Sequence, residues 1–87
     1  MTAELANKVA VITGAGRGIG RAVAHAYAKA GMSVVCSARS THEIDDVASA
    51  IKAAGGASTA IACDVTRPEQ VAELMRATEA TYGGIDL

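Results

Sequence analysis

A run of glycines between a predicted strand and a predicted helix constrains this chain more than any other feature. The run reads Thr13-Gly-Ala-Gly-Arg-Gly-Ile-Gly20. Glycines at such a junction let backbone N–H groups at the start of the helix approach an anion closely. The spacing T-G-x-x-x-G-x-G differs from G-x-G-x-x-G, because position 19 is Ile, and from a P-loop, because no Gly-Lys-Ser/Thr follows. We therefore predict a phosphate-binding turn, the alternative being a tight turn with no ligand.

The elements around this turn alternate in type. Short apolar runs rich in β-branched residues predict buried strands at 8–13, 33–37 and 58–63. Apolar residues at spacings of three and four predict helices between them and after the third strand, and a fourth strand begins at 85–87. Strands that alternate with helices form parallel sheets with right-handed crossovers. The chain is thus predicted to be α/β, the N-terminal half of a doubly wound (Rossmann) parallel sheet, β-α-β-α-β-α, with strand order 3-2-1.

Local signals predict how the helices begin, end and pack. Ser40 with Glu43, and Thr66 with Glu69, have the spacing of capping boxes, and Gly31 is expected to end the first helix. The spacing also predicts the apolar helix faces, which are Ile19, Val23, Ala26, Tyr27 and Ala30 in the first helix, Ile44, Val47, Ala48 and Ile51 in the second, and Val71, Leu74, Met75 and Thr78 in the third.

Composition narrows the class of protein. The 87 residues allow one domain, and a net charge of −1 without a basic run gives no sign of a nucleic-acid partner. No apolar stretch is long enough to span a membrane, and no metal site is predicted. Cys36 and Cys63 lie inside apolar runs, so we expect free, buried thiols in a cytoplasmic protein.

Taken together, the motifs resemble those of the short-chain dehydrogenase/reductase family. The matching residues are Thr13, Gly14, Gly18 and Gly20 in the turn, Asp64-Val65 after the third strand, and Gly84-Ile-Asp-Leu87. The resemblance implies a nicotinamide dinucleotide cofactor whose adenine is contacted by the Asp64 carboxylate and the Val65 backbone. The predicted cofactor-binding residues are Gly14, Arg17, Gly18, Ile19, Gly20, Arg39, Asp64 and Val65.

The end of the second strand indicates which cofactor binds. Ala38 stands where NAD-binding folds usually carry an acidic residue for the ribose 2′-OH, and Arg39 follows it. A guanidinium suits a 2′-phosphate, and Arg17 in the turn adds a second positive charge. We predict NADP(H), with NAD(H) less favoured, although two solvated arginines would also fit the sequence.

The resemblance further implies a homo-oligomeric oxidoreductase that transfers a hydride between NADP(H) and an alcohol or carbonyl substrate. The family's catalytic Asn-Asn-Ala-Gly segment, catalytic serine and Tyr-x-x-x-Lys pair are not found in these residues. Neither tyrosine is followed by the required lysine, because Gly31 stands four residues after Tyr27 and Asp86 four residues after Tyr82. Tyr27 is expected in the core and Tyr82 on the surface.

We therefore predict that residues 1–87 form a partial dinucleotide-binding domain, truncated at the start of its fourth strand and inactive alone. The edge of the first strand, at 9–12, is expected to be unpaired, and the chain to self-associate. The alternatives are a non-catalytic nucleotide-binding module and an inactive truncated product.

Overall fold

The computed structural model describes residues 6–87. Three strands, β1 (Val9–Thr13), β2 (Ser33–Ala38) and β3 (Ala57–Ala62), alternate with three helices, α1 (Gly18–Lys29), α2 (Thr41–Ala53) and α3 (Pro68–Tyr82). All six elements confirm the predicted order, with small shifts at their ends.

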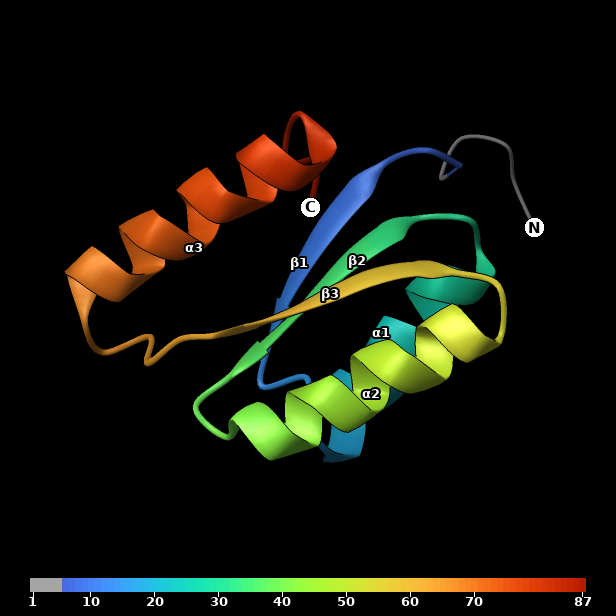
Figure 1. Ribbon diagram of the computed structural model, residues 1–87, viewed down its shortest axis with the longest axis horizontal. Helices are drawn as coiled ribbons and strands as arrows, with labels where there is room; N and C mark the ends of the chain where they lie inside the picture. Colours follow the sequence, from blue (N-terminus) through green and yellow to red (C-terminus); the bar gives the residue numbers. More distant parts are fainter. Residues whose placement is uncertain (1–5) are drawn as a thin grey trace.

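The strands form one parallel sheet in the order β1-β2-β3, which confirms the predicted order 3-2-1. Val9 pairs with Ser33, and Ser33 pairs with Ala57, so all strands run in the same direction. In Figure 1, α1 and α2 lie on one face of the sheet and α3 lies on the other. Right-handed crossovers produce this arrangement, and they bring the three strand-to-helix loops to one edge of the sheet.

The core is divided by the sheet into two unequal clusters. The alternation of β2 side chains directs Val34 and Cys36 into the larger cluster, beneath α1 and α2, and Val35 into the smaller one, beneath α3. The predicted face of α2 is confirmed, because Ile44, Val47, Ala48 and Ile51 are all buried. The α3 face is also confirmed, with Leu74 and Thr78 buried, and Val71 and Met75 half-buried.

The predicted face of α1 is partly wrong. Ile19 is 85% exposed and Ala26 is exposed, whereas Ala24 is completely buried. The helix contacts the sheet through small residues, with Gly20 against the turn and Ala24 and Ala28 one and two turns later. Alanine fits either face of a helix, so the spacing predicted the helix correctly but assigned part of its face wrongly.

Neither predicted capping box forms. Ser40 is the N-cap of α2, but its side chain makes no capping hydrogen bond. The N-cap of α3 is Arg67, because the Thr66 hydroxyl donates instead to Asp64 Oδ1 at 2.7 Å. Glu69 accepts from Arg67 Nε at 2.9 Å rather than reaching back to Thr66. Capping spacing therefore located the start of α2 and, to within one residue, the start of α3, without predicting the contacts.

The edge of β1 is paired, which corrects the expectation that it would be open. Leu87 N–H donates to Val9 O at 3.1 Å, and Val11 N–H donates to Leu87 O at 2.9 Å. Asp86 Oδ2 also accepts from Val9 N–H at 2.8 Å. The two Leu87 bonds have the pattern of a parallel ladder. The sheet of the described residues nevertheless has three strands, so the fourth strand stays a prediction.

The prediction that Tyr82 lies on the surface is wrong. It is half-buried against the cluster beneath α3, and its hydroxyl lies 2.8 Å from Thr59 Oγ1 on β3. Tyr27 packs against the larger cluster as predicted. The hydrogen bond therefore joins the end of α3 to the outer strand of the sheet.

Both cysteines are free and buried, as predicted. Burial raises the pKa of the Cys36 thiol, and the Ser58 hydroxyl, 3.5 Å from its sulfur, acts in the opposite direction. None of the helices within residues 6–87 combines the length and the apolar character needed to cross a membrane.

Candidate functional site

A cleft of about 590 Å³ lies at the carboxyl-terminal edge of the sheet. The turn after β1, the loop after β2 and the loop after β3 enclose it, and ligands of open parallel sheets bind at this edge. The residues that line it are Thr13, Gly14, Gly16, Arg17, Ala38, Arg39, Ser40, Glu43, Cys63, Asp64, Val65 and Thr66.

The turn after β1 needs glycine for two different reasons. Gly14 and Gly18 have φ angles of +65° and +61°, in the left-handed region that side chains disfavour. At Gly20 the reason is contact, because a Cβ there would lie 2.1 Å from the carbonyl oxygen of Gly14. The Ala15 N–H donates to Ser37 O at 3.1 Å and fixes the turn to the end of β2. The N-terminus of α1 is thereby held at the cleft.

Two guanidinium groups line the cleft beside Ala38. Arg17 is the N-cap of α1, and Arg39 is in the loop between β2 and α2. Both are exposed, and neither forms an ion pair with another residue of the described part of the chain. Ala38, the last residue of β2, brings no carboxylate next to Arg39, so these two guanidinium groups can receive an anion.

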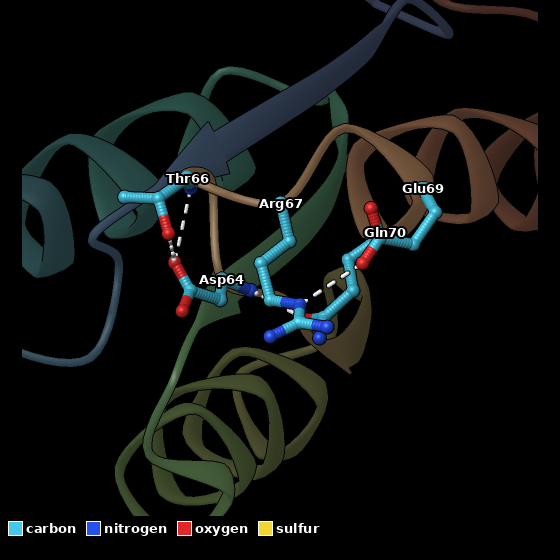
Figure 2. Close-up of polar contacts among 5 residues, drawn as sticks. All are labelled: Asp64, Thr66, Arg67, Glu69 and Gln70. Atoms are coloured by element: carbon cyan, nitrogen blue, oxygen red, sulfur yellow. Dashed lines mark hydrogen bonds and ion pairs between the residues drawn. The ribbon is translucent and has the colours of Figure 1, made fainter.

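The Asp64 carboxylate is held in place by the residues that follow it (Figure 2). Its Oδ1 accepts from the Thr66 N–H at 3.0 Å and from the Thr66 hydroxyl at 2.7 Å. These hydrogen bonds, with a smaller contribution from the charges of Arg39 and Arg67, lower the pKa of Asp64. The Asp64 N–H donates to Gln70 Oε1 at 2.8 Å. Asp64 is therefore an ionised acceptor on a fixed loop.

The structure brings most of the predicted site residues together. Gly14, Arg17, Arg39, Asp64 and Val65 line the cleft, and the Val65 side chain is 59% exposed there. The other three, at 18–20, begin α1 and lie outside the lining.

Sequence reasoning missed several lining residues. Gly16 was overlooked within the turn, and Cys63 and Thr66 flank the Asp64-Val65 pair that was identified. Glu43 was assigned to a helix cap, although it lies against the turn: a Cβ at Gly16 would be 2.8 Å from the Glu43 Cβ. No local pattern signals that contact, because the two residues meet only after the sheet has formed.

Comparison with known proteins gives one family. The family model described as short chain dehydrogenase matches residues 8–87. An uncharacterized oxidoreductase of Mycobacterium tuberculosis is 43% identical over 84 residues, which cover 97% of this chain and 32% of that protein. The 3beta-hydroxysteroid dehydrogenase 1 of Eggerthella lenta is 38% identical over 85 residues, covering 97% of this chain and 33% of the relative. The chain spans about a third of the length of these relatives.

Solved structures agree with this comparison. A short-chain type dehydrogenase/reductase from Mycobacterium marinum superposes with a TM-score of 0.90 at 45% identity, over 94% of this chain and 33% of that one. A metagenomic short-chain oxidoreductase in complex with NADP gives a TM-score of 0.90 at 37% identity, over 97% of this chain and 38% of that one. These identities accompany nearly complete coverage of residues 1–87.

Proposed function

The chain belongs to the short-chain dehydrogenase family, and on that premise we propose that its cleft binds the adenosine half of NADP(H) for an oxidoreductase. The observation that carries this proposal is that Arg17 and Arg39, which form no ion pair within residues 6–87, line one cleft with Ala38, which provides no carboxylate. A solved relative in complex with NADP supports it.

Each part of the cofactor has a matching part of the cleft. The glycines of the turn and the N-terminus of α1 receive the pyrophosphate, through Gly14, Gly18 and Gly20, with Ile19 exposed beside it. The adenine would lie at the loop after β3, where the ionised Asp64 carboxylate and the backbone of Val65 would contact it. The 2′-phosphate lies between Arg17 and Arg39.

NADP(H), when bound, would supply the hydride for reduction of a carbonyl carbon or accept one from an alcohol. Residues 1–87 contain no Tyr-x-x-x-Lys. We propose that these residues bind and orient the cofactor and catalyse no hydride transfer by themselves. A homo-oligomeric assembly and a cytoplasmic location stay predictions from the sequence.

Cofactor selectivity tests the proposal. A hydrogen bond to a charged group contributes about 1.5–3 kcal/mol, so Arg39→Ala should weaken NADPH binding about 10- to 150-fold and affect NADH much less. Ala38→Asp should act in the same direction by repelling the phosphate, and it should offer an acceptor to the ribose 2′-OH of NADH. Arg17→Ala should have a smaller effect of the same sign. The measurement is the ratio of the NADPH and NADH dissociation constants for each variant.

Arg76→Ala provides the matched control, because Arg76 is an exposed arginine on α3 that pairs with Glu73 outside the cleft. Its ratio should equal that of the unmodified chain. The NADP(H) proposal fails if the unmodified chain prefers NADH, or if Arg39→Ala weakens both cofactors equally.

A further inference from the structure

Glu43 adds a second acidic residue, besides Asp64, to the lining of the cleft that contains the two arginines. It belongs to the first turn of α2, is half-buried, and lines the cleft with Arg17, Arg39 and Ser40. Its side chain lies against the turn, because a Cβ at Gly16 would be 2.8 Å from the Glu43 Cβ and 3.3 Å from its Oε1. The absence of a side chain at position 16 is what gives Glu43 this place.

Glu43 also borders a second hollow, and its carboxylate has no ionic partner among the described residues. Glu43, Gly16 and Arg17 border a second hollow of about 400 Å³ between α1 and α2, so Glu43 stands where the two hollows meet. Within residues 6–87 it forms no ion pair. The other carboxylate of the cleft, Asp64, has its Oδ1 occupied by Thr66. Among the described residues, Glu43 is therefore the carboxylate of this cleft with neither oxygen in a hydrogen bond or ion pair.

Resting on the proposed function, we propose that Glu43 is a specificity-determining residue that limits the preference of this cleft for NADP(H) over NAD(H). A 2′-phosphate attracted by Arg17 and Arg39 is repelled by the nearby carboxylate. A ribose 2′-OH lacks that charge and can donate a hydrogen bond to the same carboxylate. The chain thus carries an acidic group in the first turn of α2 in place of one at position 38, and the cleft accepts both cofactors.

The substitution Glu43→Gln tests this inference, because it removes the charge and keeps the shape that packs against Gly16. The probes are adenosine 2′,5′-bisphosphate and 5′-AMP, which carry the two versions of the adenosine half and need no nicotinamide site. Titrations of the 87-residue chain followed by NMR suit weak affinities. Glu43→Gln should tighten binding of the bisphosphate about 3- to 10-fold. Binding of 5′-AMP should stay the same or weaken, and added salt should reduce the difference.

Asp45→Asn is the matched control. Asp45 is an exposed carboxylate on the same helix, two residues away and outside the cleft lining. It should leave the ratio of the two dissociation constants close to that of the unmodified chain. An unchanged ratio in Glu43→Gln, or equal changes in both variants, would overturn the inference. If the unmodified chain binds neither probe, the proposed function itself fails and this inference fails with it.

Discussion

At the residue scale, the Thr66 hydroxyl in the loop after β3 positions the Asp64 carboxylate and lowers its pKa. Thr66 has the spacing of a helix cap, but its hydroxyl and its N–H both donate to Asp64 Oδ1. The loop thereby holds Asp64 ionised at the cleft while Gln70 binds its N–H. A residue that would have stabilised a helix end instead fixes a candidate ligand-binding group.

Thr66→Val should raise the pKa of Asp64 toward its ordinary value, because it removes the hydroxyl that contributes most to the lowered pKa. A pKa that is lower in the folded state stabilises the fold above the unfolded-state pKa, and this stabilisation is lost as the pH falls through the folded-state pKa. The unmodified chain should therefore exceed Thr66→Val in stability at neutral pH, and the difference should vanish in acid. NMR titration of the carboxyl carbon gives the pKa directly.

Thr81→Val is the control for that experiment, since the Thr81 hydroxyl donates to Ala77 O on the exposed side of α3. It should leave the titration of Asp64 unchanged. An Asp64 pKa that does not move in Thr66→Val would show that the backbone N–H alone sets it.

At the scale of elements, α3 is the one helix of the described chain that covers the second face of the sheet (Figure 1). Its buried contact is small, and consists of Leu74 with Val35 and Cys63, flanked by half-buried side chains. The hydrogen bond between Tyr82 and Thr59 then joins the far end of the helix to β3. Polar contact at this end supplements a limited apolar one.

Tyr82→Phe should lower the free energy of unfolding by about 0.5–1.5 kcal/mol, because it removes the hydroxyl and leaves Thr59 Oγ1 half-buried without that partner. Thr59→Val removes the other partner. Urea denaturation of the two single variants and the double variant gives the coupling between them. The double variant should lose less stability than the sum of the single losses; additive losses would mean that the two hydroxyls do not interact.

At the scale of the whole molecule, the β1 edge is paired at Val9 and Val11, so we attribute the expected self-association to the sheet face that α3 covers rather than to that edge. Val9 and Val11 have backbone partners in Asp86 and Leu87, so that edge does not offer free groups there. Apolar side chains stay accessible nearby, with Ile85 exposed and Leu87 61% exposed. Exposed apolar surface beside a thinly covered sheet favours association.

Residues 1–87 alone should therefore be marginally stable or self-associate, as measured by sedimentation over a range of concentrations. Leu87→Asp should weaken the association, because it places a charge on this surface without removing a buried side chain. Ala72→Asp, on the exposed side of α3, adds the same charge elsewhere and should have little effect. A monomer at all concentrations with a sharp, cooperative melt above ~65 °C would contradict the prediction.

Sequence by itself determined the elements, their order and the position of the turn. Periodicity reports whether a segment is a helix or a strand, and right-handed crossovers leave few arrangements for alternating elements. It also located Gly14, Arg39 and Asp64, because each lies within two residues of the end of a strand, and strand ends meet at one edge of a parallel sheet.

Tertiary structure alone decided which partners the side chains take. Glu43 lies against Gly16 instead of capping its helix, Tyr82 hydrogen-bonds to Thr59, and Leu87 pairs with β1. Gly16 lies in the turn after β1 and Glu43 in the first turn of α2, and only the folded sheet brings them together. A local pattern shows which hydrogen bonds a side chain could make with its neighbours in sequence. The folded chain adds competing partners from distant segments, and these determined the charge balance of the cleft.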